Sequence, residues 1–273
     1  MLKIKDIKNL SELRELKKAY FEQATAPLDG MWHFGFVPLA RHWGFYVNNS
    51  LVGFCCINDD GYMLEFHLQP NFQTNPKELF TLIAEQNSSV IGHVKGAFVS
   101  TGEPNYLSLC LDSSSKFTVN ALMYQQATKA VNEPLDSIEM DFAVKEQLVE
   151  FVQFASDNIA APKEWLNGYY SNLIEREELL GYWNKGQLQA VGECRLFDEY
   201  QTEYADLGMI VSQSERGQGI AKKVLSFLVK YASNKGLKSI CSTGRDNIAA
   251  QKAIARVGFL PSNRIVQFEF NHI

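Results

Sequence analysis

The stretch SERGQGIAKKVL, residues 214–225, constrains this chain most, because it leads from a strand into a helix through two glycines. The preceding DLGMIV, residues 206–211, is typical of a strand, and the residues after Gly219 have helical apolar spacing. The first amides of a helix lack an internal partner, and the helix dipole adds partial positive charge there. Glycine lets a phosphate come close to such an end. The stretch is therefore predicted to bind an anion.

Two familiar anion-binding loops do not match this stretch. A P-loop has four residues between its first glycine and Gly-Lys-Ser/Thr, and the spacing here differs. A dinucleotide-binding loop has a third small residue where Lys222 stands, and an acidic residue at a set distance that this chain lacks. A Gly-x-Gly pair alone also leaves open a turn in which the glycines serve only the backbone shape.

The second half of the chain is predicted to be α/β with a mixed sheet. Its apolar patterns predict helices at 141–155 and after Pro162, strands within 179–197, a strand at 204–211, a helix from Gly219 to Asn234, a strand at 237–243, a helix from Asn247 to Val257, and a strand at 264–270. Gly236 is expected to end the long helix.

The first half echoes this pattern as a degenerate internal repeat. It predicts strands within 43–57, at 62–70, 96–101 and 106–112, and a helix at 77–86. Aligning 68–70 with 211–213 places Gln73 opposite Arg216 and Pro76 opposite Gly219. Proline has no amide hydrogen, and Glu78 would repel a diphosphate, so this copy is not expected to bind coenzyme A in the usual manner. A polar stretch at 132–134 predicts a boundary between residues 1–133 and 134–273.

Two motifs resemble those of the GNAT acetyltransferase superfamily. Arg216-Gly-Gln-Gly-Ile-Ala221 resembles its Arg/Gln-x-x-Gly-x-Gly/Ala signature, and Asn247-x-x-Ala250 with Gly258-Phe259 resembles its second motif. The resemblance covers roughly residues 141–270, and more weakly the first half. It implies an α/β fold of two GNAT-like mixed sheets flanked by helices. The C-terminal half would be the intact catalytic domain, and the N-terminal half a degenerate one that is structural or shapes the acceptor site.

The resemblance also implies that acetyl-CoA is the co-substrate, and no metal is expected. The implied cofactor-binding residues are the splayed strand and the loop that follows it, with one residue of the second motif: Met209, Ile210, Val211, Arg216, Gly217, Gln218, Gly219, Ile220, Ala221 and Asn247. Arg216 either adds positive charge or fixes the loop. Asn247 either contacts the cofactor or caps its own helix.

Acetyl transfer to an amine requires a route for the amine proton and a group that receives the thiolate. Glu193 and Asp206 are the leading candidates for the base, although each is alternatively a solvated charge at a strand end. Many GNAT enzymes place a tyrosine at the position of Ile254, which cannot donate a proton. Tyr204 is the candidate acid in its place; Ser242, Thr243 and Cys241 are alternatives, and a thiolate can also leave without an acid.

The predicted function is N-acetyl transfer from acetyl-CoA to a primary amine of a small molecule or peptide. A coenzyme A-binding sensor without catalysis, or an acyltransferase that uses a longer acyl-CoA, as in glycine N-acyltransferases, are the alternatives. The acceptor and the oligomeric state stay open.

The bulk composition restricts the classes of partner and the cellular location that are expected for this protein. Hydrophobic residues make up 46% and charged residues 21%, as in a globular protein, and the net charge of −5 argues against a nucleic-acid partner. The sequence shows neither a secretory signal nor a run long enough for a transmembrane helix, so no membrane partner is expected. The five cysteines lack CxxC spacing and predict reduced thiols in the cytoplasm. Scattered histidines give no metal spacing.

Overall fold

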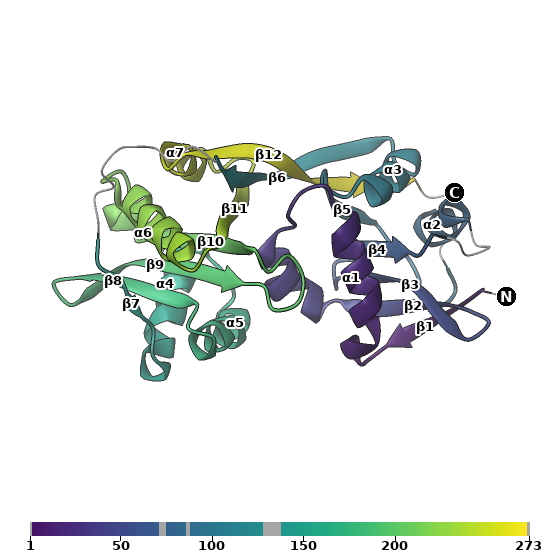
Figure 1. Cartoon of the computed structure of the whole chain (residues 1–273), viewed down its shortest axis with the longest axis horizontal. Coiled ribbons are helices and arrows are strands. Elements are labelled where there is room, and N and C mark those ends of the chain that lie inside the picture. Colours follow the sequence, from purple (N-terminus) through teal and green to yellow (C-terminus); the bar gives the residue numbers. More distant parts are fainter. Residues whose placement is uncertain (1, 71–74, 86–87, 128–137, 272–273) are drawn as a thin grey trace. The chain divides into compact units, whose positions relative to one another are not determined.

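The computed structural model describes residues 2–70, 75–85, 88–127 and 138–271 of the chain (Figure 1). Its residues form two compact units. Met1–Leu122 and Asn263–Ile273 make up the N-terminal unit, and Met123–Ser262 make up the C-terminal unit. Strands β6, Lys116–Gln126, and β12, Phe259–Glu269, therefore contribute residues to both units. The boundary predicted at 132–134 lies outside the described residues.

The N-terminal unit is a mixed sheet with helices packed on it. Its strand order is β1-β2-β3-β4-β5-β12-β6. Besides residues of β6 and β12, its elements are β1 (Leu2–Ile7), η1 (Leu10–Leu13), α1 (Arg14–Gln23), η2 (Trp32–Phe36), η3 (Val37–Leu39), β2 (Arg41–Val47), β3 (Ser50–Ile57), β4 (Tyr62–Leu68), α2 (Pro76–Ala84), β5 (Gly96–Ser100) and α3 (Pro104–Asp112). Helix α1 crosses β3 in Figure 1 and contacts it.

The main core of the N-terminal unit combines residues from distant parts of the sequence. Phe45 of β2, Phe66 of β4 and Phe80 of α2 pack in one buried cluster with Phe268 of β12. Because burial of such side chains is a dominant favourable term in folding, the end of the chain stabilises the unit formed mainly by its beginning.

Residues 106–112 form part of helix α3, so the strand predicted there is wrong. The apolar alternation of LSLCL suggested a strand. In the structure, Pro104 occupies the first helical turn, where its missing amide hydrogen is tolerated. Tyr106 and Cys110 are both buried, four residues apart on the same side of the helix.

The C-terminal unit is also a mixed sheet with helices, in the strand order β6-β11-β10-β9-β8-β7. Its elements are β7 (Asp141–Phe142), η4 (Lys145–Gln147), α4 (Leu148–Ile159), α5 (Lys163–Glu175), β8 (Leu179–Asn184), β9 (Gln187–Leu196), β10 (Tyr204–Val211), η5 (Gln213–Glu215), α6 (Ile220–Asn234), β11 (Lys238–Gly244) and α7 (Ile248–Arg256), with the first residues of β12.

The predicted elements of this unit are confirmed, with small shifts at their ends. Helix α6 has Gly219 as its N-cap, and Gly236 follows its end with a φ of 76°. The helix predicted from 141 begins later, because Asp141–Phe142 pairs with β8 and a 3₁₀ turn precedes α4. No helix in the described part of the chain is both long and apolar enough to cross a bilayer. All five cysteines are buried free thiols.

Candidate active site

The loop between β10 and α6 has a backbone that only glycine adopts readily. Gly217 has a φ of 83° and Gly219 a φ of 81°, both in the left-handed region. A Cβ built on either residue meets no atom within 4 Å, so the space on that side of each is open. The first intrahelical bond joins the Lys223 amide to the Gly219 carbonyl, at 3.2 Å. The amides of Ile220 and Ala221 therefore have no intrahelical partner and can bind an anion.

Contacts with the end of α4 hold this loop in place. Arg216 donates from Nε to the Val211 carbonyl at 3.3 Å and from Nη2 to the Asn158 carbonyl at 2.8 Å. The Gln213 amide donates to Asn158 Oδ1 at 2.7 Å. Of the two roles predicted for Arg216, these bonds account for the fixing of the loop.

Strand β10 separates from β11 before it reaches the loop. The parallel ladder between them runs from Tyr204 to Asp206, whereas the antiparallel ladder with β9 continues to Val211. Among the described strands, β10 beyond Asp206 thus pairs on one side only. The unpaired side leaves backbone groups of Met209 and its neighbours able to bind an extended ligand.

A pocket of about 510 Å³ opens at this end of β10. All the predicted cofactor-binding residues except Gln218 line it: Met209, Ile210, Val211, Arg216, Gly217, Gly219, Ile220, Ala221 and Asn247. Asn247 Oδ1 accepts a hydrogen bond from the Ala250 amide at 3.2 Å, so of the two roles predicted for Asn247 the structure shows the helix cap, and contact with the cofactor stays a prediction.

The lining of this pocket is basic. Arg216, Lys222, Lys252 and Arg256 contribute four cationic side chains, against the single carboxylate of Glu215. This charge balance attracts a polyanion.

Lys252 and Arg256 were not predicted as site residues. They stand with Ala249 and Ala253 at spacings of three and four residues along α7. Such a spacing places all four on one face of the helix. This periodicity after Asn247 is the signal that could have identified them.

The two predicted bases lie in a buried ionic cluster around Arg195. Arg195 Nη2 donates to Asp206 Oδ1 at 2.9 Å, and Nη1 forms an ion pair with Glu193. Tyr169 donates to Glu193 at 2.8 Å. Because Glu193, Arg195 and Asp206 are only 4%, 3% and 1% exposed, the alternative that the two acids are solvated charges is wrong.

Arg195 and Tyr169 were missed at the sequence level. Arg195 lies two residues after Glu193 on β9, hence on the same face, and is paired in register with Asp206. Gly208 leaves room for the cluster, since a Cβ there would stand 2.7 Å from Arg195 Nη1. The register that joins these residues depends on the fold.

Neither Glu193 nor Asp206 lines the pocket at the end of β10. Tyr204 is half-buried at the opposite end of the strand, with Lys238 Nζ 5.4 Å from the centre of its ring. Ile254 is buried in the face of α7 that packs on the unit. The structure thus places the cofactor candidates together, except Gln218, and the two candidate bases in a separate buried cluster, with Tyr204 away from the cofactor pocket.

The described part of the counterpart loop in the N-terminal unit differs from the β10–α6 loop at the start of its helix. Helix α2 follows β4, but its N-cap Asn75 accepts from the Lys77 amide at 3.0 Å, and Pro76 has no amide hydrogen. Gln73, aligned with Arg216 in sequence, lies outside the described residues.

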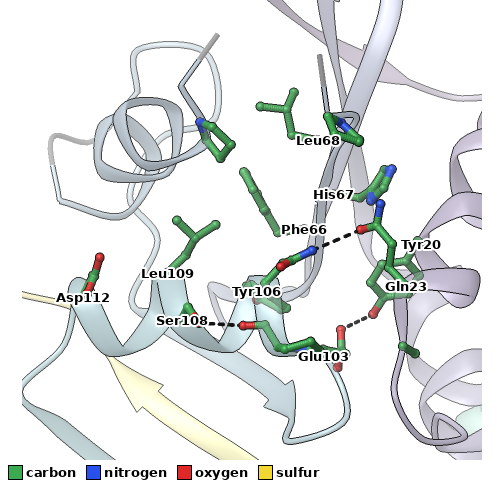
Figure 2. Close-up of a pocket in the computed structure, with 15 residues that line it drawn as sticks. Tyr20, Gln23, Phe66, His67, Leu68, Glu103, Tyr106, Ser108, Leu109 and Asp112 are labelled. Atoms are coloured by element: carbon green, nitrogen blue, oxygen red, sulfur yellow. Dashed lines mark hydrogen bonds between the residues drawn. The ribbon is translucent and has the colours of Figure 1, made fainter. Parts of the chain in front are cut away.

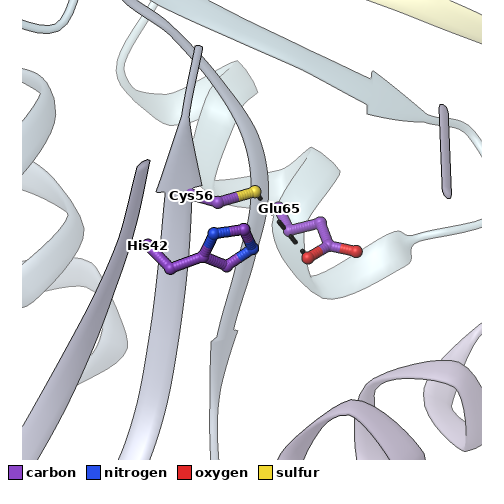
Figure 3. Close-up of side chains that lie close together, drawn as sticks. All are labelled: His42, Cys56 and Glu65. Carbon is purple, nitrogen blue, oxygen red and sulfur yellow. Dashed lines mark hydrogen bonds between the residues drawn. The ribbon is translucent and has the colours of Figure 1, made fainter. Parts of the chain in front are cut away.

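His42, Cys56 and Glu65 form a buried cluster in the N-terminal unit (Figure 3). Their ligand atoms lie within 4.8 Å of one another, close enough to share a metal ion. Glu65, however, already has a cationic partner, because Lys17 Nζ is 2.9 Å from Oε2. Burial raises the pKa of the Cys56 thiol, which opposes the thiolate that a metal requires. These contacts favour a structural ion pair over a metal site.

Comparisons with known proteins identify both halves. Residues 9–127 match a model described as an acetyltransferase (GNAT) domain, and residues 143–259 match the acetyltransferase (GNAT) family. A solved acetyltransferase of the GNAT family from Colwellia psychrerythraea is 66% identical, with a TM-score of 0.91 over 98% of this chain and 100% of that one.

More distant structures share the fold. A tandem GNAT protein from the clavulanic acid biosynthesis pathway is 12% identical, with a TM-score of 0.62 over 98% of both chains. A GCN5-related N-acetyltransferase from Sphaerobacter thermophilus is 10% identical, with a TM-score of 0.62 over 98% of this chain and 95% of that one. The search of curated proteins found no match. The chain therefore belongs to the GNAT family of acetyltransferases, with a GNAT domain in each half.

Proposed function

We propose that this acetyltransferase takes its acetyl group from acetyl-CoA bound in the C-terminal unit and transfers it to a primary amine. GNAT enzymes use acetyl-CoA as co-substrate and act in general on small-molecule or peptide acceptors. The observation that carries the proposal is the β10–α6 loop. Its two left-handed glycines leave open space beside amides that have no helical partner.

The residues present fit coenzyme A. The amides of Ile220 and Ala221 suit a diphosphate, and the basic side chains of Lys252 and Arg256 supply further attraction for phosphate. The one-sided pairing of β10 suits an extended pantetheine arm. When bound, acetyl-CoA would supply the thioester that the amine attacks.

We further propose that Glu193 and Asp206 act first as positioning residues. Both are bound to Arg195 and buried, so contact between either carboxylate and an amine requires the cluster to open. Intact, the cluster fixes Arg195 over Gly208 and so supports the strand that leads to the cofactor loop. Tyr204 lies five residues before Met209, roughly 16 Å along an extended strand.

The pH profile of turnover separates positioning from proton transfer. If Asp206 only positions the strand, Asp206→Asn lowers stability and kcat but keeps the pH dependence of kcat/KM, because the titrating base is elsewhere. If Asp206 is the base, the acidic limb of that profile disappears. Glu193→Gln and Tyr204→Phe serve as parallel variants, with Tyr204→Phe expected to change the basic limb if Tyr204 is the acid.

Release of free thiol tests the reaction itself. The purified chain is incubated with acetyl-CoA and a panel of small amines and peptide N-termini, and the free coenzyme A thiol is measured over time. We expect thiol release that depends on the amine. Acetyl-CoA binding with no release for any amine would support the sensor instead, and absence of binding would refute the site. Propionyl-CoA and longer donors in the same assay test the length of the acyl chain.

A further inference from the structure

A second pocket, in the N-terminal unit, is built from elements that correspond to those of the cofactor pocket. It has a volume of about 350 Å³ and is lined by the end of α1, the end of β4, the start of α2 and the length of α3 (Figure 2). The pocket at β10 is lined by the equivalent end of α4, end of β10, start of α6 and α7. The two domains thus each carry a cavity at the same place in the fold.

The charge of the second pocket is opposite to that of the first. Among the described residues, no lysine or arginine lines it, whereas Glu103 and Asp112 do. The amides at the start of α2 offer little to an anion, because Pro76 has none and the Asn75 side chain occupies that of Lys77. A phosphate or carboxylate ligand would meet repulsion here, and no lysine or arginine among the described lining residues offsets it.

Glu103 is a buried carboxyl group that has no cationic partner among the described residues. It is 9% exposed and accepts hydrogen bonds from the Tyr20 hydroxyl and, at 2.8 Å, from the Ser100 amide. Among the described residues, none forms an ion pair with it. Burial raises its pKa to about 7. Because buried charges in proteins are normally paired, a carboxyl group in this state at a pocket wall is suited to a ligand that brings the positive charge.

A second buried polar group lines the same cavity. His67 is 3% exposed, and its Nε2 atom has no hydrogen-bond partner among the described residues. Burial lowers the pKa of His67 to about 4, so the ring is neutral at pH 7 and adds no repulsion for a cation.

Aromatic rings form much of the remaining wall. Tyr20, Phe66 and Tyr106 all line the pocket, and the first two come from different elements, α1 and β4 (Figure 2). The negative face of an aromatic ring attracts a cation, most strongly where water is excluded, and the rings also bury an apolar body. Carboxyl group and rings therefore favour the same kind of ligand.

We propose that the N-terminal pocket binds a small organic ammonium ion, a primary amine on an apolar or aromatic body, with Glu103 as its counter-ion. This site is separate from the acetyl-CoA pocket, and it gives the N-terminal domain a binding function of its own. Binding involves no covalent step: the ammonium group donates to the carboxylate, and its apolar body covers the rings.

Isothermal titration of the full chain, without acetyl-CoA, tests this proposal. The probes are benzylamine, butylamine and cyclohexylamine, with benzyl alcohol and benzoate as neutral and anionic counterparts of similar shape. We expect at least one amine to bind, and the alcohol and the benzoate to bind at least about tenfold more weakly, because both lack the charge that Glu103 requires.

Three variants locate the binding site. Glu103→Gln removes the counter-ion, and Asn105→Trp places an indole at an exposed position that lines the pocket. Each should weaken amine binding by about tenfold or more. Glu22→Gln is the matched control, because Glu22 is an exposed carboxylate on helix α1, which also carries Tyr20, but does not line the pocket. It should leave the affinity unchanged.

Each unfavourable result has a definite meaning. If Glu103→Gln fails to fold because the single amide oxygen cannot accept from both Tyr20 and the Ser100 amide, Asn105→Trp still decides the location. Equal affinity for the amine and the alcohol would overturn the role of charge. Unchanged affinity in Asn105→Trp, or no binding by any amine of the panel, would overturn the site. If Gly219→Ala loses acetyl-CoA binding but keeps amine binding, the two sites are distinct, as proposed.

Discussion

Replacing Gly219 by alanine tests whether the loop between β10 and α6 binds the cofactor's diphosphate, and Gly236, just past the other end of α6, provides a matched control. The two glycines have φ values of 81° and 76°, at the two ends of α6. A Cβ added to either meets no atom within 4 Å, so neither substitution creates a clash. A left-handed conformation costs an L-residue about 1–2 kcal/mol, and both variants should lose stability by this amount.

Only the variant at Gly219 should also lose cofactor affinity. Its Cβ stands beside the amides of Ile220 and Ala221, where the diphosphate is expected. A hydrogen bond to a charged group contributes about 1.5–3 kcal/mol, so the loss of one such bond raises the Kd for coenzyme A roughly 10- to 100-fold. Gly236 follows the other end of the helix, and its replacement leaves the loop unchanged.

Calorimetric titration with coenzyme A gives the affinities, and urea unfolding of the same samples gives the stabilities. We expect equal losses of stability and a loss of affinity in Gly219→Ala alone. Unchanged affinity in Gly219→Ala would refute diphosphate binding by this loop. Equal weakening in both variants would show that destabilisation of α6, rather than contact with the ligand, controls binding.

Three further predictions concern charge. Lys17→Met leaves Glu65 buried without its cation and should lower the free energy of unfolding by about 3–5 kcal/mol, measured by urea denaturation, whereas Lys17→Met with Glu65→Leu should recover most of it. Burial raises the pKa of Glu103 from 4.5 to about 7, so the folded state holds this proton more tightly than the unfolded state. The free energy of unfolding should therefore fall by about 3 kcal/mol as the pH rises from 4.5 through 7. Urea denaturation at a series of pH values measures this slope, and Glu103→Gln should remove it. The double variant Lys252→Gln, Arg256→Gln should bind coenzyme A more weakly, and its affinity should depend less on salt concentration. If titrations in low and high salt give the same affinities as the unaltered chain, these two side chains do not attract the cofactor.

The cofactor loop could be predicted from sequence because its constraints are local. Two left-handed positions next to a helix start favour glycine for local backbone reasons, and Gly236 marks the helix end for the same reason. The Asn247 cap depends only on the residues of its own first turn. The role of Arg216 was left between two alternatives, because its partners lie at the end of α4, far away in sequence.

Features that depend on pairing between distant residues escaped prediction. The partnership of Arg195 with Asp206 follows from the β9–β10 register, which the residue types alone do not specify. Residues 106–112 of helix α3 were predicted as a strand, because a short apolar run suits either structure and the burial of Tyr106 and Cys110 on one helical face becomes visible only after folding. The exclusion of Glu193 from solvent has the same origin.

Strand β12 has a consequence for the order of events during synthesis. Residues 263–269 complete the sheet of the N-terminal unit, and Phe268 belongs to its core, yet they leave the ribosome after the whole C-terminal unit has been made. A nascent chain that has exposed Met1–Leu122 therefore still lacks one strand of the N-terminal unit, and one edge of β5 stays unpaired. The half of the protein that is translated first is expected to mature last, opposite to the usual vectorial order.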